Sequence, residues 1–362
     1  MSKKIEFHGS DLEKTANYYQ IPKEDIIQFG ANVNPIGLSD NIKEALAAHL
    51  DIISSYPDRN YTSLKCAVSR YCGCSPDNVV VGNGSTELIS LLISQRSAKK
   101  ALVLGPTYSE YARELALTGG SLSYYNLKES DDFILDTEDF IKSIPNGTDL
   151  IIICNPNNPT SSAVTQADME KIVKFCRTEN IFVMVDETYV EFVPDIARIT
   201  AVPLTGRYDN LMVIRGVSKF FAAPGLRFGY GITSSREFLS MLFTHQNPWS
   251  LNSIGAYAGE LMLQDEEFIE RTRQLIGSER DRLCRQLKSL NTFKVYQPYA
   301  NFILLRILKD GVTSFQVFET AIKEKLMIRD CSSFQSLDGE FVRFCIMRPE
   351  DNERLLQILK SI

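Results

Sequence analysis

Two short apolar runs near the middle of the chain predict buried strands. Residues 181–185 and 211–214 are rich in Val, Ile and other apolar residues, and polar residues bound both runs. Apolar runs without polar alternation are typical of parallel strands that are covered on both faces. Asp186 closes the first run, and Lys219 lies just past the second. Because parallel strands end at one edge of a sheet, where ligands bind, we expect these two side chains to share that edge.

Strands and helices are also predicted on either side of this central stretch. Earlier in the chain we expect strands at 79–81, 101–104 and 150–154, and helical patterns at 11–19, 40–50 and 88–93. A further helix is expected at 236–245. A long amphipathic stretch then begins near Trp249, and we expect a helix there to cross into a second domain.

The pattern changes in the last part of the chain, from about residue 292. Strands at 293–296, 302–306 and 341–346 are mixed there with helices at 314–325 and 351–360. This mixture predicts a small α/β unit. We therefore divide the chain into an N-terminal arm (1–36), a large domain (37–250), and an interdomain helix with a small C-terminal domain (251–362).

A glycine-rich turn follows the strand expected at 79–81 and opens a helical pattern. Its residues run from Gly82 to Glu87 and include Gly84, Ser85 and Thr86. A strand, a glycine turn and a helix N-terminus in succession present backbone amides and the positive end of the helix dipole to an anion. Ser85 and Thr86 add hydroxyl donors, so the turn predicts a phosphate-binding site.

Lys219, Asp186 and Arg227 together indicate a particular cofactor. An isolated lysine is usually a solvated surface residue. Here an acid, a lysine and an arginine occur together in and after two predicted strands. The acid suits pairing with a ring nitrogen, the lysine suits forming an imine, and the arginine suits holding a phosphate. Pyridoxal 5′-phosphate needs such a set, because it forms a Schiff base with lysine and pairs its pyridinium nitrogen with an acid.

The motif Ser218-Lys219-x-Phe221, followed by Gly225-Leu226-Arg227, resembles fold-type I pyridoxal-phosphate enzymes of the aminotransferase class I and II family. The resemblance implies an α/β fold with a large, mostly parallel-sheet α/β/α domain and a small α/β C-terminal domain. It also implies that Lys219 forms the resting aldimine and then carries protons, and that Asp186 keeps the pyridine nitrogen protonated.

The same resemblance implies further contacts to the cofactor. Tyr108 would stack on the pyridine ring, Asn158 and Tyr189 would reach the phenolic O3′, and Gly84, Ser85, Thr86, Ser218 and Arg227 would hold the phosphate. Tyr56 would reach the phosphate in the other subunit of a homodimer. Without the resemblance, Tyr108 is equally well a core tyrosine and Tyr56 only an aromatic residue in a turn.

Two positions depart from the family pattern. Gly216 stands where relatives usually have a Ser or Thr that binds the phosphate, so one hydroxyl donor is missing. Ser218, Ser85 and Thr86 are the candidates to compensate for it. Ser161 replaces the usual glycine after the segment 155–160, which resembles the Asn-Pro-x-Gly signature of the family.

Two arginines near the predicted C-terminal strands are candidate substrate ligands. A strand arginine is more often a surface residue, but the segment 342–350 resembles the family segment whose first arginine, here Arg343, clamps the substrate carboxylate. The planar, bidentate guanidinium suits that task. Further candidates for an anion pocket or the surrounding loop are Arg329, His8, Asn32 and Gly37. The alternative for residues 32–37 is a plain turn, and for His8 a disordered terminal residue.

Finer matches resemble the branch of the family that acts on phosphate-bearing amino acids. They include Tyr56-Pro57-Asp58 and Pro248-Trp249-Ser250-x-Asn252. The implied reaction converts L-threonine O-3-phosphate to (R)-1-aminopropan-2-yl phosphate and CO2, a step of cobalamin biosynthesis. Transamination, of histidinol phosphate for example, is the alternative, because one electron sink serves both reactions. A non-enzymatic binding protein is disfavoured by the intact set Lys219, Asp186, Asn158, Tyr189 and Arg227.

The composition excludes several classes of protein. The 362 residues are 44% hydrophobic and 23% charged, which is ordinary for a globular protein. The net charge of −6 and the lack of a basic block argue against nucleic acid and anionic membranes as partners. No apolar run has membrane-spanning length and the N-terminus lacks a signal-peptide core, so a cytoplasmic location is expected.

Cysteine and histidine give no indication of a metal site. The eight cysteines are scattered, and the Cys72-Gly-Cys74 spacing is unusual for zinc and has no second pair. The three histidines lie far apart in the sequence. For a cytoplasmic chain we expect the cysteines to be reduced thiols.

Overall fold

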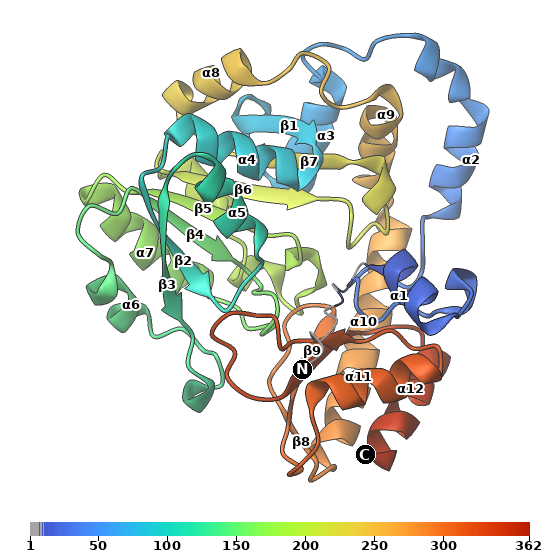
Figure 1. Cartoon of the computed structure of the whole chain (residues 1–362). Coiled ribbons are helices and arrows are strands. Elements are labelled where there is room, and N and C mark those ends of the chain that lie inside the picture. Colours follow the sequence, from blue (N-terminus) through green and yellow to red (C-terminus); the bar gives the residue numbers. More distant parts are fainter. Residues whose placement is uncertain (1–6, 8, 10) are drawn as a thin grey trace.

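The structure is a computed structural model that describes Phe7, Gly9 and residues 11–362. Two sheets organise the chain, one of seven strands and one of four strands near the C-terminus (Figure 1). This arrangement confirms the predicted α/β fold class with a large, mostly parallel sheet and a small second unit.

The large sheet has the strand order β1-β7-β6-β5-β4-β2-β3. Its strands are β1 (Val79–Asn83), β2 (Lys100–Gly105), β3 (Ser121–Asn126), β4 (Leu150–Cys154), β5 (Phe182–Asp186), β6 (Leu211–Gly216) and β7 (Phe228–Ile232). Strands β2 to β6 pair in parallel, whereas β7 is antiparallel to both β6 and β1. All residues of β4, β5 and β6 are buried, as the continuous apolar runs predicted.

Alternate residues of these strands enter two different cores. Ile152, Met184 and Ile214 pack on one face, whereas Ile151 and Val183 pack on the other. The first face is covered by α4 (Gly84–Arg96), α5 (Glu110–Leu117) and α8 (Arg236–His245). The helices of the second core include α3 (Thr62–Cys72), α6 (Thr137–Ser143), α7 (Gln166–Thr178) and α9 (Ser253–Met262).

The small sheet is antiparallel and has the order β10-β11-β9-β8. Its strands are β8 (Phe293–Val295), β9 (Phe302–Ile307), β10 (Arg329–Asp330) and β11 (Phe341–Cys345). The remaining helices are α1 (Leu12–Tyr19), α2 (Asp40–Ala48), α10 (Glu266–Lys288), α11 (Ser314–Lys323) and α12 (Pro349–Ser361). In Figure 1, α11 and α12 lie beside this sheet and α10 extends towards it from the larger part.

The sequence pattern predicts one long helix after Trp249, and this prediction is wrong because the structure has two helices in that stretch. Helix α9 ends at Met262, and α10 begins at Glu266. Between them the Asp265 carboxylate accepts the backbone N–H of Phe268 and caps α10. An aspartate cap followed by two glutamates satisfies free amides and complements the helix dipole, so a new helix starts there.

A buried ion pair ties the ends of β5 and β6 together. Arg215 donates from Nε and Nη2 to Glu187 Oε2, at 2.9 and 2.7 Å. Glu187 also accepts from Thr200 Oγ1 and the backbone of Ala201. Because Glu187 follows Asp186 and Arg215 lies four residues before Lys219, the pair fixes the two strand ends that carry the candidate catalytic residues.

In the described part of the chain, no helix is both long enough and apolar enough to cross a bilayer.

Candidate active site

The carboxyl ends of β4, β5 and β6 open onto one cavity of about 390 Å³. Asp186 ends β5, Asn158 follows β4, and Ser218 and Lys219 follow β6. Cavities at this edge are the usual ligand sites of open α/β sheets. The small unit closes the other side of the cavity with Arg329 and Arg343.

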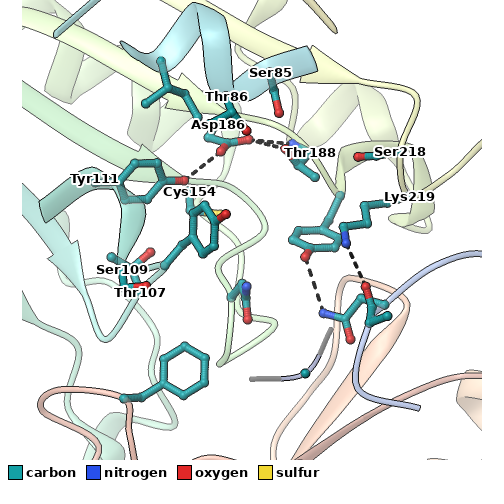
Figure 2. A pocket seen from close by; sticks show the side chains of 18 of the residues that line it. Ser85, Thr86, Thr107, Ser109, Tyr111, Cys154, Asp186, Thr188, Ser218 and Lys219 are labelled. Carbon is teal, nitrogen blue, oxygen red and sulfur yellow. Dashed lines mark hydrogen bonds between the residues drawn. The ribbon is translucent and has the colours of Figure 1, made fainter. Parts of the chain in front are cut away.

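Asp186 is fully buried at the floor of the cavity. Its carboxylate accepts from Tyr111 Oη at 2.7 Å, from Thr188 Oγ1 at 2.5 Å and from the Thr188 backbone at 3.0 Å. Figure 2 shows these bonds converging on Asp186. Burial raises the pKa of the carboxyl, and the donors from Thr188 and Tyr111 act in the opposite direction. These donors are neutral, so the carboxylate is prepared to pair with a cation that enters the cavity.

Lys219 is half-buried, and its Nζ donates to the backbone carbonyl of Ala31 at 2.7 Å. Burial, and secondly the positive charge of Arg343, lower the pKa of the amine to about 8. Arg227 acts in the same direction. A lysine with a lowered pKa holds a larger fraction of neutral, nucleophilic amine near neutral pH.

An anion cradle lies at the N-terminus of α4. Ser85 and Thr86 line the cavity there, together with Arg227 and Ser218. Gly84 has φ +80°, and a Cβ at this position would overlap the guanidinium of Arg227. Glycine is therefore required for Arg227 to lie against the turn. Hydroxyls, helix amides and a guanidinium in one place suit a phosphate group.

Gly216 lies beside this cradle. A Cβ built there would be 3.6 Å from Ser85 Cβ and 3.7 Å from Ser85 Oγ. The position that carries a phosphate-binding hydroxyl in relatives is thus next to Ser85, which lines the cavity itself. The nearest other atom, Phe228 O, would be 3.4 Å away, so a small side chain fits without displacing the backbone.

Two hydrogen-bonded pairs of polar residues, Arg343 with Asn158 and Asn32 with Tyr189, line the cavity. Arg343 Nη1 donates to Asn158 Oδ1, which leaves the Asn158 amide group free to donate into the cavity. Asn32 Nδ2 donates to Tyr189 Oη at 3.4 Å. Burial raises the pKa of the Tyr189 hydroxyl, so it is a neutral donor at neutral pH.

Arg329 and Arg343 of the small sheet are paired across β10 and β11. Arg343 donates to Asn158 Oδ1 and, at 2.7 Å, to the carbonyl of Gly30. Arg329 donates to the carbonyl of Phe7 and, at 2.6 Å, to Ser333 Oγ. Both side chains are buried, and burial lowers the pKa of Arg329. Two buried guanidiniums with neutral oxygen partners favour anionic ligands.

Most of the predicted site residues meet in this one cavity. Its lining includes Asn32, Ser85, Thr86, Tyr108, Asn158, Asp186, Tyr189, Ser218, Lys219, Arg227, Arg329 and Arg343. Gly84 lies under Arg227 without lining the cavity. Gly37 and Tyr56 do not line it, and Tyr56 is 81% exposed. His8 lies outside the described residues.

Several residues of the site are not predicted from the sequence. Tyr111 and Thr188 hold Asp186, and Ser333, Phe334 and Gln335 line the end near Arg329. Thr188 has a local signal, because a hydroxyl residue two positions after an aspartate often bonds it in a turn. Tyr111 has no comparable signal, since its contact with Asp186 depends on tertiary packing.

Comparisons with known proteins agree with this geometry. Residues 24–359 match the family described as Aminotransferase class I and II. A protein of Caldanaerobacter subterraneus subsp. tengcongensis, provisionally named as a threonine-phosphate decarboxylase, is 36% identical over 332 residues, which are 92% of this chain and 89% of the relative. The threonine-phosphate decarboxylase of Salmonella typhimurium is 30% identical over 355 residues, 98% and 96% of the two chains.

The solved structure of a histidinol-phosphate aminotransferase from Clostridium acetobutylicum is also similar. It has a TM-score of 0.85 and 32% identity, and the match covers 91% of this chain and 97% of that one. The chain therefore belongs to the aminotransferase class I and II family. Pyridoxal 5′-phosphate is the cofactor of this family, and the cavity suits it in having a buried acid without a cationic hydrogen-bond partner, a lysine of lowered pKa and an anion cradle.

The lowered pKa of Lys219 predicts how the cofactor-free protein takes up pyridoxal 5′-phosphate. Only the neutral amine attacks an aldehyde, so the recombination rate should rise about tenfold per pH unit below pH 8 and level off above it. The absorbance change after mixing measures this rate, with N-α-acetyl-lysine as the reference for an ordinary amine. A protein rate that keeps rising to pH 10 would contradict the lowered pKa.

The geometry at Gly216 predicts that Gly216→Ser strengthens cofactor binding. The new hydroxyl would lie beside Ser85 and add one charge-assisted hydrogen bond, so the dissociation constant should fall about five- to tenfold. Equilibrium dialysis measures the constant. Gly206→Ser is the control, because no atom lies within 4 Å of a Cβ there. Equal or weaker binding in Gly216→Ser would show that the cradle does not extend to this position.

Proposed function

We propose that this chain is a pyridoxal-phosphate-dependent lyase that decarboxylates L-threonine O-3-phosphate. The products are (R)-1-aminopropan-2-yl phosphate and CO2, and a proton replaces the carboxyl group at Cα. The observation that carries the proposal is the pair of buried arginines beyond the cofactor residues. One cation for a carboxylate and one for a phosphate match a substrate with two anionic groups.

In the proposed mechanism the residues of this chain orient the substrate and move the proton. When bound, pyridoxal 5′-phosphate supplies a sink for the electron pair of a bond broken at Cα. Asp186 would pair with its ring nitrogen, Asn158 and Tyr189 would donate to O3′, Tyr108 would cover the ring, and Ser85, Thr86, Ser218 and Arg227 would hold its phosphate. Lys219 Nζ would then deliver a proton to Cα.

Decarboxylation requires the bond between Cα and the carboxylate to stand perpendicular to the plane of the cofactor ring. Arg343 is the candidate to hold it, because Arg343 contacts Asn158 and is the cation with the largest effect on the pKa of Lys219. Arg329 lies at the end of the cavity that Ser333 and Phe334 line, so it is the candidate to hold the distal phosphate.

Transamination of a phosphorylated amine is the second candidate function. The 32% identity with a histidinol-phosphate aminotransferase structure favours it, and the same lysine would move the proton. The two reactions differ in which bond of Cα is broken, and this follows from the direction in which Arg343 holds the substrate.

An assay of CO2 tests the proposal. Protein loaded with pyridoxal 5′-phosphate is mixed with L-threonine O-3-phosphate in the absence of any keto acid, and we expect catalytic release of CO2. The absence of CO2, with the cofactor absorbance bleached by histidinol phosphate and restored by 2-oxoglutarate, would replace the decarboxylase with an aminotransferase.

We further propose a homodimer. Tyr56 and Trp249 form an exposed aromatic pair with ring centroids 4.8 Å apart, and Arg59 lies over the Trp249 ring. Exposed aromatic residues with an arginine are typical of interfaces. A second chain would cover this pair and bring Tyr56 to the cofactor phosphate of its partner. Light scattering at micromolar concentration should give twice the mass of the chain, and an active monomer would contradict the proposal.

A further inference from the structure

The cavity wall near Arg329 is formed by a turn of the small unit. This turn connects β10 to β11, and Ser333, Phe334 and Gln335 in it line the cavity. Backbone hydrogen bonds hold the turn, from Cys331 to the carbonyl of Phe341 and from Phe334 to the carbonyl of Cys331, both at 3.0 Å. Leu337 anchors its far end in the core. The three lining residues are therefore presented on a fixed backbone.

Ser333 and Phe334 both contact the Arg329 guanidinium. Ser333 Oγ accepts from Arg329 Nη2 at 2.6 Å, and the Phe334 ring centroid lies 5.4 Å from Arg329 Cζ. Because Ser333 Oγ accepts this bond, its own hydroxyl hydrogen is available to a ligand. Ser333 is exposed and lines the cavity, so this hydrogen can point into the space that a ligand fills.

The surroundings of the two arginines differ in the kind of neighbour. Arg343 contacts the side-chain oxygen of Asn158 and the carbonyl of Gly30, and neither oxygen can donate. Arg329 contacts the carbonyl of Phe7 and the hydroxyl of Ser333, and this hydroxyl can donate as well as accept. A phosphoryl group offers three terminal oxygens and accepts more donors than a carboxylate with two. The Arg329 end of the cavity is thus better suited to phosphate than the Arg343 end.

We propose that Ser333 is a specificity-determining residue that, together with Arg329, binds the phosphoryl group of the substrate, while Phe334 holds the guanidinium in place. The inference rests on the proposed function, because it needs a phosphate-bearing substrate. It does not depend on which bond of Cα is broken. It assigns the selection of phosphorylated over unphosphorylated amines to the turn after β10.

The test compares ligands that differ only in the phosphate. Dissociation constants of L-threonine O-3-phosphate and L-threonine are measured from the cofactor absorbance of the loaded protein. Ser333→Ala should weaken binding of the phosphorylated ligand about tenfold, the effect of one hydrogen bond to a charged group. Binding of L-threonine should change less than about twofold, and Ser333→Thr should restore binding of the phosphorylated ligand.

Two controls separate this role from a structural one. Ser336→Ala changes a nearby serine of the same turn that does not line the cavity, and it should leave both constants unchanged. Inorganic phosphate, as a competitor of the phosphorylated ligand, should bind about tenfold more weakly to Ser333→Ala. Equal weakening of both ligands would mean that the substitution only disturbs the turn, and no weakening would mean that Ser333 does not bind phosphate. Either result overturns the proposal.

The dissociation constants of histidinol phosphate and histidinol are compared in the same way. The test of the phosphate site then does not depend on the outcome of the CO2 assay. A wild-type protein that binds L-threonine O-3-phosphate but releases no CO2 would overturn the decarboxylation alone. A wild-type protein that prefers the phosphorylated ligand in neither pair would overturn the phosphate site.

Discussion

Replacing Lys219 with alanine should abolish turnover, with kcat lowered by about 10⁴-fold or more. The variant loses the amine that bonds the cofactor and the group that carries the proton to Cα, and one positioned acid–base group alone contributes up to about 10⁴-fold. The fold should persist, because among the described residues Nζ makes one hydrogen bond, to the carbonyl of Ala31. The measurement is the CO2 assay together with the visible absorbance of the protein.

Lys171→Ala is the matched control for this substitution. Lys171 is a mostly exposed lysine paired with Asp168 on α7, away from the cavity, so its loss should leave turnover unchanged. Circular dichroism of both variants checks the fold. Turnover above background in Lys219→Ala, with wild-type ellipticity, would remove Lys219 from the mechanism.

Asp186→Asn should lower kcat by about 10² to 10³-fold, the usual cost of removing one preorganised electrostatic group. Asparagine has the shape of aspartate but no charge, so it cannot stabilise a protonated ring nitrogen. It also turns one amide hydrogen towards Tyr111 or Thr188, which now donate to the carboxylate. The measurement is kcat at saturating substrate, with the cofactor content determined separately.

Tyr111→Phe is the graded comparison for Asp186. It removes one of the three hydrogen bonds to the carboxylate but keeps the charge, so kcat should fall less than about tenfold. This order of effects distinguishes the charge of Asp186 from its packing. If Asp186→Asn kept more than a third of wild-type kcat, the carboxylate would have no role at the ring nitrogen.

The sequence was informative where a residue's chemistry is tied to its local segment. Asp186 ends a buried strand and Ser85 opens a helix after a glycine turn, and both positions follow from patterns within about ten residues. Lys219 and Arg227 belong to one short motif that resembles a known family, and the structure places both in the same cavity.

The sequence was less informative about elements that exist only through their neighbours. Strand β3 and the antiparallel strand β7 were not predicted, because the Gly-Tyr-Gly of β7 has weak strand propensity and is stabilised by pairing with β1 and β6. The break between α9 and α10 was also missed, since both helices continue one apolar pattern and only the cap at Asp265 separates them.

The sequence by itself determined the fold class, the cofactor and many of the polar residues that line the cavity. Those features depend on apolar periodicity and on short motifs, which are local properties. Tertiary structure alone decided that Tyr111 holds Asp186 and that Arg343 orients Asn158. Tyr111 reaches Asp186 from α5, and Arg343 reaches Asn158 from the small sheet, so only the packing of distant segments brings these partners within hydrogen-bonding distance.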